Sequence, residues 1–211
     1  KLYGGDNNDV LDGGIGNDEL YGGKHDDTLY SSVGIDTLDG GEGINTLNLS
    51  NETAEITLDL SDANNNAGGN IANDTISNID NIVGSSQKDI LTGNDDANSI
   101  NGGADDDTLE GKGGADTLHG GSAGTDTVTY KSSQFGVTVN LETGAGEDGD
   151  AQGDTLISIE NLIGSDQADT LTGTNSENIV NTLSGLKGED IIYGGGGIDT
   201  IYGGENADDL Y

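Results

Sequence analysis

Residues 4–48 read GGDNNDVLD, GGIGNDELY, GGKHDDTLY, SSVGIDTLD and GGEGINTLN, which are five consecutive units of nine residues. The sixth position of these units is Asp9, Asp18, Asp27, Asp36 and then Asn45. The eighth position is always leucine, at Leu11, Leu20, Leu29, Leu38 and Leu47. A short fixed period with one acid and one aliphatic side chain per unit predicts a stacked solenoid rather than an ordinary globule.

The unit GGIGNDELY, residues 13–21, shows how each repeat is expected to fold. Its glycines permit the positive φ angles of a tight turn. Strand alternation then points Leu20 inward and its neighbours Glu19 and Tyr21 outward. Each unit should supply a six-residue turn and a three-residue strand, so that two units complete one coil of eighteen residues. We predict an all-β fold, a right-handed parallel β-roll, or β-solenoid, of short stacked strands.

The repeats fall into three blocks, at residues 4–48, 84–128 and 164–211, separated by two spacers that copy each other. ITLDL at 56–60 matches VTVNL at 137–141, and DTISNIDNIVGS at 74–85 matches DTLISIENLIGS at 154–165. Alternating apolar and polar residues in ITLDL and VTVNL predict half-buried strands. We therefore expect two longer irregular coils within one continuous solenoid, divided at 1–48, 49–128 and 129–211.

The third block contains a break in the period. GTNSENIVN at 173–181 is followed by three residues, Thr182 to Ser184, before the next unit begins. With the break placed there, Asn178 occupies the sixth position and Val180 the eighth. Asn98 similarly stands at a sixth position in the second block. We predict weak or absent ligand function at both asparagines.

The chain is strongly acidic, with 40 acids against 6 bases and a formal net charge of -34. Self-repulsion on this scale opposes a compact state, so the chain is either disordered or neutralised by cations. The charge argues against nucleic acid and anionic membrane surfaces as partners. No apolar run is long enough for membrane insertion. The chain has 0 cysteines and cannot form disulfides, so bound metal has to supply any cross-linking of an extracellular fold.

Carboxylates and turn carbonyls are hard oxygen ligands, which suit calcium in shells of six to eight. One turn cannot fill such a shell, but the turn eighteen residues further on should stack against it. We therefore expect several calcium ions, each shared by a pair of stacked turns. The predicted aspartate pairs are Asp9 with Asp27, Asp18 with Asp36, Asp89 with Asp107, and Asp190 with Asp208. The pair of Asp27 with Asn45 should bind more weakly, because asparagine brings no charge.

The pattern G-G-x-G-x-D-x-U-x resembles the RTX (hemolysin-type) calcium-binding nonapeptide-repeat family. The resemblance implies that turn carbonyls join the carboxylates, as at Gly14 and Gly16 with Asp18. The candidate metal ligands are Gly5, Asp9, Gly14, Gly16, Asp18, Gly23, Asp27, Gly34, Asp36, Gly41, Gly43, Asp89, Gly103, Asp105, Asp107, Gly114, Asp116, Asp169, Gly188, Asp190, Gly195, Gly197, Asp199, Gly204 and Asp208. Ser31 and Ser32 replace the glycine pair and His25 a glycine, so those turns should bind weakly or stay empty.

The resemblance also implies a secreted bacterial protein, exported by a type I system and located extracellularly or at the cell surface. We expect the chain, which begins at Lys1, to be a fragment of a longer protein, disordered without calcium and folded with it. We expect no catalytic activity. H-E-x-x-H is absent, and GGSAG at 120–124 lies in a repeat turn without a helix context.

Two hypotheses for the parent protein stay open. One is a structural or adhesive protein, and the other is a secreted protease, lipase or polysaccharide epimerase that uses this module as its C-terminal secretion and folding segment. Other copies of the chain, neighbouring domains of the parent and a surface glycan are the candidate partners besides calcium. The tyrosines that would form a glycan-binding strip are Tyr3, Tyr21, Tyr30, Tyr193, Tyr202 and Tyr211, although outward strand positions favour tyrosine anyway.

A few acids lie out of phase with the repeat. In the second spacer these are Glu147, Asp148, Asp150 and Asp154, within or beside DGDAQGD. They form either an extra calcium site or a solvated loop. The same two alternatives apply to Asp62 and the run Asn64–Asn66 in the first spacer.

Overall fold

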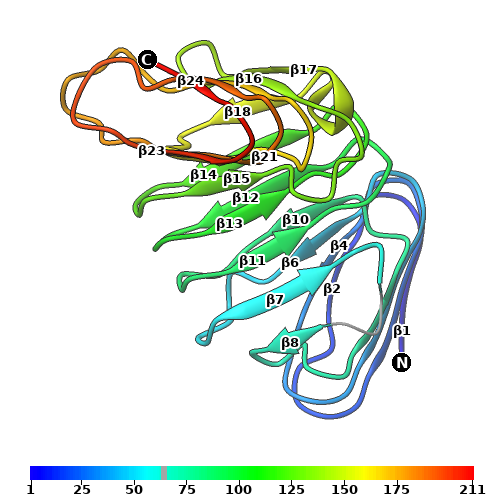
Figure 1. Cartoon of the computed structure of the whole chain (residues 1–211). Coiled ribbons are helices and arrows are strands. Elements are labelled where there is room, and N and C mark those ends of the chain that lie inside the picture. The colour runs from blue at the N-terminus through cyan, green and yellow to red at the C-terminus, as the bar shows by residue number, and fades with distance from the viewer. Residues whose placement is uncertain (63–65) are drawn as a thin grey trace.

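A computed structural model describes residues 1–62 and 66–211. The described residues form short strands and a single 3₁₀ turn, η1 (Gly149–Ala151). Among the described residues every strand pairing is parallel, except for the antiparallel pairings made by the two short spacer strands at 67–68 and 145–147. The predicted all-β parallel β-roll is therefore confirmed (Figure 1). The described part of the chain has no helix of the length and apolarity that a membrane crossing requires.

Within the described residues the strands form three sheets. Sheet A has the order β1 (Leu2–Asp6), β3 (Glu19–Lys24), β5 (Thr37–Glu42) and β9 (Thr75–Ser77). Sheet B has the order β2 (Val10–Asp12), β4 (Thr28–Tyr30), β6 (Thr46–Asn48), β10 (Asn81–Val83), β12 (Ser99–Gly103), β14 (Thr117–Gly121), β18 (Thr155–Ile157), β17 (Ala145–Glu147), β16 (Thr138–Asn140), β20 (Thr170–Thr172), β22 (Ile191–Tyr193) and β24 (Asp209–Leu210). Sheet C has the order β23 (Thr200–Glu205), β21 (Thr182–Lys187), β19 (Asn161–Ile163), β15 (Thr127–Thr129), β13 (Thr108–Glu110), β11 (Ile90–Thr92), β7 (Ile56–Asp59) and β8 (Ala67–Gly68).

Strands within the repeat blocks pair with the predicted step. Leu11 lies opposite Leu29, and Leu91 lies opposite Leu109, so that equivalent residues are eighteen positions apart. Where a spacer intervenes, the step lengthens but the residue types still match. Leu38 faces Ile76 and Leu118 faces Leu156, a step of 38 residues in both copies. The roll therefore absorbs each spacer without losing the inward register of its aliphatic side chains.

Each spacer ends one face of the roll and starts another. Sheet A stops at β9, while β7 in the first spacer begins the stack that continues through β11. In the second spacer, the parallel stack of sheet B stops at β18, and β16 begins a new stack through β20. Antiparallel β17 joins these two stacks into one sheet. Figure 1 shows the result, with the N-terminal strands and the C-terminal coils at opposite ends of a bent stack.

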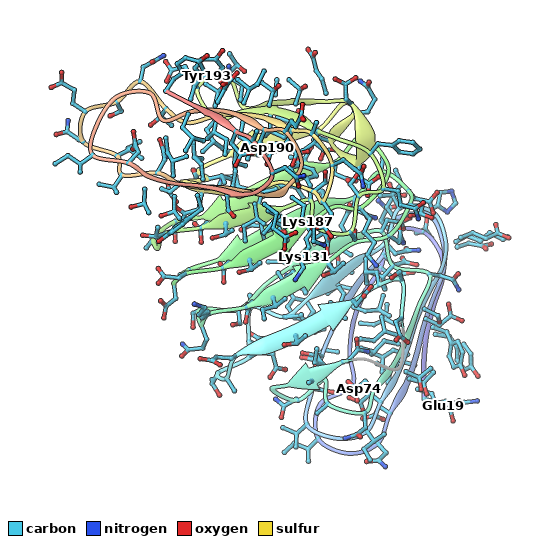
Figure 2. The ribbon with its side chains drawn as sticks, in the orientation of Figure 1. Glu19, Asp74, Lys131, Lys187, Asp190 and Tyr193 are labelled. Atoms are coloured by element: carbon cyan, nitrogen blue, oxygen red, sulfur yellow. The ribbon has the colours of Figure 1, made fainter. Side chains whose placement is uncertain are left out.

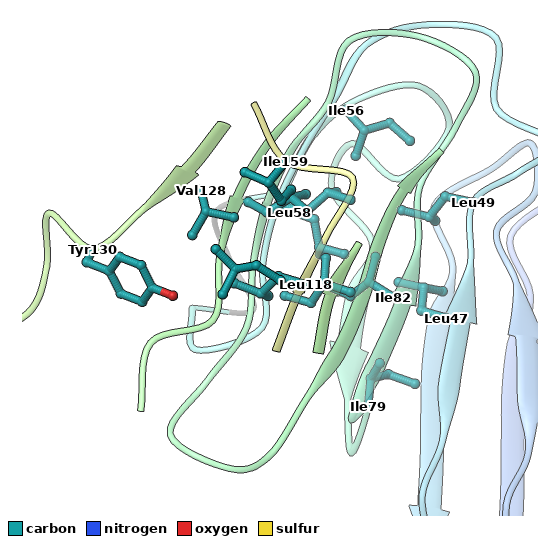
Figure 3. Packing of buried hydrophobic residues seen from close by; sticks show 14 of the residues in the cluster. Leu47, Leu49, Ile56, Leu58, Ile79, Ile82, Leu118, Val128, Tyr130 and Ile159 are labelled. Atoms are coloured by element: carbon teal, nitrogen blue, oxygen red, sulfur yellow. The ribbon is translucent and has the colours of Figure 1, made fainter. Parts of the chain in front are cut away.

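The core consists of buried, mostly aliphatic side chains that pack between the sheets along the roll (Figure 3). The repeat leucines Leu20, Leu29, Leu38 and Leu47 are fully buried. Burial of one such side chain stabilises the fold by about 1.5–3 kcal/mol. Tyr130 in the second spacer is also buried, and its hydroxyl donates a hydrogen bond of 2.9 Å to Asp154 Oδ2. The spacer is thus anchored to the roll by both packing and a polar contact.

The predicted position of the three extra residues of the third block, at Thr182 to Ser184, is wrong. The extra residues lie in the turn that precedes β21. Leu183 is fully buried opposite Leu162, whereas Val180 is 56% exposed. Thr182 to Ser184 belong to β21. Asn181, and not Asn178, therefore holds the sixth position. An insertion in a surface turn leaves strand pairing intact, whereas an insertion within a strand would break the register.

Candidate metal centres

The sixth-position residues form ladders along the turns. In most repeats the backbone N–H of this residue donates to the side-chain Oδ1 of its counterpart one coil further along the chain. Asn45 and Asp126 donate instead to Asp80 Oδ2 and Glu160 Oε2. The four predicted pairs all show the Oδ1 contact, with N–O distances of 2.7 Å for Asp9–Asp27, 2.8 Å for Asp18–Asp36, 2.8 Å for Asp89–Asp107 and 3.2 Å for Asp190–Asp208. Asp27 and Asn45 stack likewise, at 3.0 Å. One carboxylate oxygen of each pair is therefore used to hold the coils together.

The second carboxylate oxygen is left buried and unsatisfied in several of these turns. Within the described part of the chain, Oδ2 has no hydrogen-bond partner in Asp27, Asp74, Asp107, Asp116 and Asp190. A buried charged oxygen without a donor carries a desolvation penalty of more than about 1–3 kcal/mol. A proton or a cation beside each of these five oxygens would relieve this penalty.

For four of these five aspartates, all except Asp74, a glycine makes room for the Oδ2 atom. A Cβ added at Gly22 would overlap both Asp27 Oδ2 and the carbonyl oxygen of Gly40, which belongs to the next coil. The same clash with the next coil's carbonyl and with the carboxylate recurs at Gly102. A carboxylate oxygen and a carbonyl oxygen thus converge from two coils. Two acceptors facing each other without a donor fit a shared hard cation, and calcium prefers this donor set.

Side chains alone do not complete such a shell. Among the described residues no group of three or more His, Cys, Asp or Glu side chains meets at one point. The remaining ligands therefore have to be backbone carbonyls or water, as the turn conformation allows. Of the glycines predicted as ligands, all except Gly34 adopt positive φ, as Gly14 does at 79° and Gly16 at 127°. Asp105 takes the same left-handed conformation, at 72°.

Other turns satisfy their own carboxylate. Ser85 donates to Asp89 twice, from its N–H to Oδ2 at 2.6 Å and from its hydroxyl to Oδ1 at 3.0 Å. Ser165 and Asp169 repeat this arrangement at 2.7 and 2.8 Å. In the turn with the serine pair, Ser32 Oγ donates to Asp36 Oδ2 at 2.9 Å. The candidates Asp36, Asp89 and Asp169 therefore differ from Asp27 and Asp107, because their second oxygen already has a donor.

Burial shifts the titration of the ladder carboxylates. Desolvation raises the pKa of Asp107 and of Asp116 to about 7. The same cause raises the pKa of Asp74, Asp154 and Asp190 to about 6. Near neutral pH these groups are partly protonated in the metal-free fold. A cation that binds to them has to displace protons, so metal affinity should rise with pH.

Sequence reasoning missed several ladder residues. Asp74 and Asp154 lie in the spacers, but each accepts the N–H of a repeat aspartate at 2.8 Å, from Asp36 and Asp116 respectively. Asp154 is therefore a ladder member and not part of a solvated loop. Asp126 also accepts an N–H, from Asp107. The triplet Asp-Thr-aliphatic, which occurs at all three positions as in the repeats, was the available signal.

For the remaining acids of the second spacer loop, an extra calcium site and a solvated loop both stay predictions. Glu147 and Asp148 are exposed, and Asp148 Oδ2 accepts a hydrogen bond of 3.2 Å from Thr138 Oγ1. Asn64 and Asn65 in the first spacer lie outside the described residues.

Four of the six tyrosines of the predicted strip form two stacked pairs near the two ends of the chain. The rings of Tyr3 and Tyr21 are 5.1 Å apart, and those of Tyr193 and Tyr211 are 4.9 Å apart. Lys1 Nζ lies over the first pair. Figure 2 shows Tyr193 and Glu19, which accepts a hydrogen bond from Tyr21, at these opposite ends. A single continuous strip is therefore not formed.

The family model described as "RTX calcium-binding nonapeptide repeat (4 copies)" matches residues 3–38, 31–50, 74–109, 102–129, 158–185 and 178–210. The chain belongs to the RTX calcium-binding nonapeptide-repeat family. No curated protein matches it. The RTX repeat is a structural element that binds calcium. The matches overlap Asp74 but stop short of Asp154.

Proposed function

We propose that this RTX module folds when calcium enters its stacked turns and then serves as a rigid structural or adhesive part of a larger bacterial protein outside the cell. The observation that carries the proposal is the set of buried Oδ2 atoms, such as those of Asp27 and Asp107, which lack a donor among the described residues. A charge of -34 adds general repulsion that bound cations reduce.

The turns differ in whether the Oδ2 atom of their aspartate already has a hydrogen-bond donor. We assign calcium to turns whose second residue is left-handed and whose Oδ2 has no donor, with Asp27, Asp107 and Asp190 as the leading carboxylates. Gly23, Gly103 and Leu186 are those second residues, with φ of 114°, 114° and 71°. Turns with Ser32, Ser85 or Ser165 at this position should remain formed without an ion of their own.

The proposed calcium requirement supports an extracellular location. Extracellular calcium modules work at about 10⁻⁴–10⁻³ M, far above the calcium level of a bacterial cytoplasm. A chain that needs such concentrations stays unfolded during export and folds afterwards. This agrees with the secretion route associated with RTX proteins.

The duplicated spacers favour a structural or adhesive role over a folding segment of a secreted enzyme. Each spacer ends one face of the roll and starts another while the stack continues, and the second spacer copies the first. Such a repeated design supports a scaffold, because a secretion signal does not require it. The sequence preceding Lys1 in the parent gene distinguishes the two roles. Further repeats support the scaffold, and a protease, lipase or epimerase domain supports the alternative, a C-terminal secretion and folding module.

Circular dichroism of the chain at neutral pH tests the folding proposal. We expect a disordered spectrum in excess chelator, a β spectrum after calcium is added, and little change with magnesium, which sheds its water reluctantly. An unchanged β spectrum with a cooperative thermal transition in chelator would refute the proposal.

A further inference from the structure

Each spacer contains a turn that is three residues shorter than a repeat turn. These short turns are Asn78–Asp80 and Ser158–Glu160, which connect β9 to β10 and β18 to β19. Their first residues adopt the same left-handed conformation, with φ of 53° and 54°. A short turn cannot offer the glycine carbonyls of a repeat turn, so the coils stacked on it need another way to meet it.

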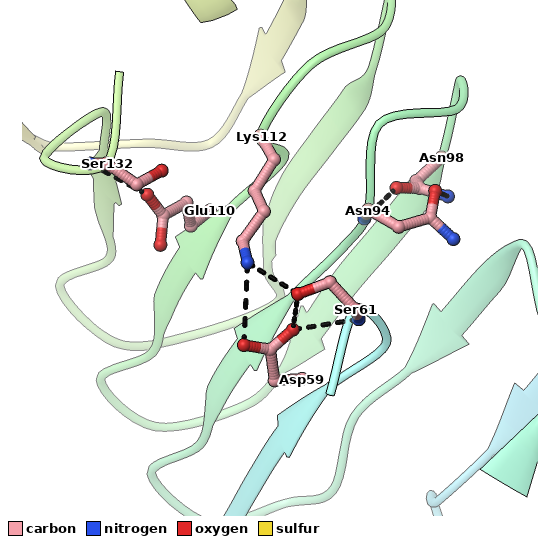
Figure 4. A network of polar contacts seen from close by, with 7 residues as sticks. All are labelled: Asp59, Ser61, Asn94, Asn98, Glu110, Lys112 and Ser132. Atoms are coloured by element: carbon pink, nitrogen blue, oxygen red, sulfur yellow. Dashed lines mark hydrogen bonds and ion pairs between the residues drawn. The ribbon is translucent and has the colours of Figure 1, made fainter. Parts of the chain in front are cut away.

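In the first spacer, asparagine amides make this contact from both sides. Asn45 Nδ2 donates to the Asn78 carbonyl at 3.1 Å, and Asn98 Nδ2 donates to the Asp80 carbonyl at 2.8 Å. Both asparagines are at least 97% buried and hold sixth positions. Figure 4 shows Asn98 beside Asn94, whose N–H is accepted by Asn98 Oδ1 at 2.8 Å. The amide thus places a hydrogen-bond donor where a repeat turn would share a cation.

The second spacer repeats the arrangement on one side only. Asn181 Nδ2 donates to the Glu160 carbonyl at 2.6 Å. On the other side, where the first copy has Asn45, the second copy has Asp126. The backbone contacts agree, because Asp126 N–H donates to Glu160 Oε2 at 2.9 Å and Asn45 N–H donates to Asp80 Oδ2 at 2.7 Å. The two copies therefore differ in the side chain at this position, which is an amide in Asn45 and a carboxylate in Asp126.

At this junction two acceptors face each other. A Cβ added at Gly120 would overlap both the Ser158 carbonyl oxygen and Asp126 Oδ2, just as one at Gly40 would overlap the Asn78 carbonyl and the Asn45 side chain. Asp126 is 97% buried, and its Oδ1 is already used by Asp107 N–H at 2.8 Å. No donor to its Oδ2 is found in the described ranges. Two carboxylates, Asp126 and Glu160, replace the single one of the first copy.

We propose that Asn45, Asn98 and Asn181 replace calcium with a side-chain amide at the short turns, and that the junction of Asp126 with the Ser158 carbonyl binds a calcium ion of its own. This site differs from the shared site of two repeat turns, because one side is a three-residue turn. The inference rests on the proposed function, since it requires the module to bind calcium.

Reciprocal substitutions test the proposal through calcium stoichiometry, measured by equilibrium dialysis with metal analysis. Asp126→Asn should lower the number of bound ions by one, and Asn45→Asp should raise it by one. Both proteins should fold in saturating calcium. The charge-matched controls are Asp12→Asn, whose exposed side chain accepts Gly14 N–H as an amide also can, and Asn48→Asp on the outward face of β6. Neither control should change the stoichiometry.

The outcomes separate the two claims. If the wild-type protein binds no calcium, the proposed function and this inference both fail. If it binds calcium but Asp126→Asn retains the wild-type number of ions, only the inference is overturned. An Asp126→Asn protein that no longer folds in calcium also overturns it, because the amide should then take the place of the ion. A gain of one ion in Asn45→Asp supports the same geometry independently.

Discussion

At the scale of single residues, the second position of a unit decides how the carboxylate four residues later is satisfied. Serine there, as at Ser85, turns its N–H and hydroxyl toward the aspartate. A left-handed residue such as Gly23 does not, and Asp27 Oδ2 stays without a donor in the described structure. The sequence repeat alone treats both kinds of turn as equivalent.

Substitution of Ser85 by alanine tests the self-satisfied turn. Ser85→Ala removes the hydroxyl donor to Asp89 and should lower the free energy of unfolding by about 1–3 kcal/mol, with no loss of bound calcium. Ser86→Ala, at an exposed neighbouring position, is the control and should be neutral. Chemical denaturation in saturating calcium measures both. Loss of a calcium ion in Ser85→Ala would contradict the assignment of this turn.

The glycine that faces the carboxylate gives a second test. Gly22→Ala places a Cβ on Asp27 Oδ2 and the Gly40 carbonyl, so we expect weaker calcium binding and a loss of about 1–3 kcal/mol in stability. Gly113→Ala is a matched control, because the nearest atom to its Cβ lies 3.7 Å away. Equal calcium affinities for the two variants in calorimetric titrations would argue against an ion beside Gly22.

The raised carboxylate pKa values predict an unusual pH dependence for the metal-free protein. Burial raises the pKa of Asp107 and Asp116 from 3.8 to about 7. Protonation therefore favours the fold, and this stability is present below about pH 4 and lost as the pH rises toward 7. Calcium-depleted protein should show more β structure by circular dichroism at pH 3.5 than at pH 7.5. The reverse order would mean that these carboxylates are not buried without metal.

At the scale of elements, the repeat predicted the strands, the eighteen-residue coil and the aspartate pairs, because strand alternation and stacking fix them. It did not predict how the spacers continue the ladders, since Asp74 and Asp154 follow irregular segments with no period. The sixth position was assigned to Asn178 and not to Asn181, because the period alone does not show where the three extra residues lie. The triplet Asn-Thr-Leu at 181–183 repeats that at 45–47 and would have placed it correctly. The boundaries after residues 48 and 128 stay a prediction.

Tyr130 links the second spacer to a ladder, and its hydroxyl can be tested separately from its packing. Tyr130→Phe keeps the buried ring but removes the donor to Asp154 Oδ2. We expect a loss of about 1–3 kcal/mol in unfolding free energy, because a buried carboxylate oxygen loses its partner. Tyr30→Phe, on the outward face of β4, should have little effect in the same denaturation experiment.

At the scale of the whole molecule, the core is thin and the charge is large. One buried aliphatic side chain per unit has to order nine residues, and the surrounding carboxylates repel each other. Lysines offset little of this, although Lys112 bridges Asp59 and Ser61 across two coils (Figure 4). The account therefore makes calcium a structural component of the fold and not a regulator of a fold that already exists.

Small-angle X-ray scattering during a calcium titration tests this claim most directly, because it measures the compactness of the whole chain. Without calcium, we predict the radius of gyration of an unfolded chain of this length, about 50 Å, and with calcium a value near that of a folded domain, about 17–20 Å. The transition should coincide with calcium binding and reverse on chelation. A radius of gyration that is already about 20 Å in chelator at neutral pH would contradict the account.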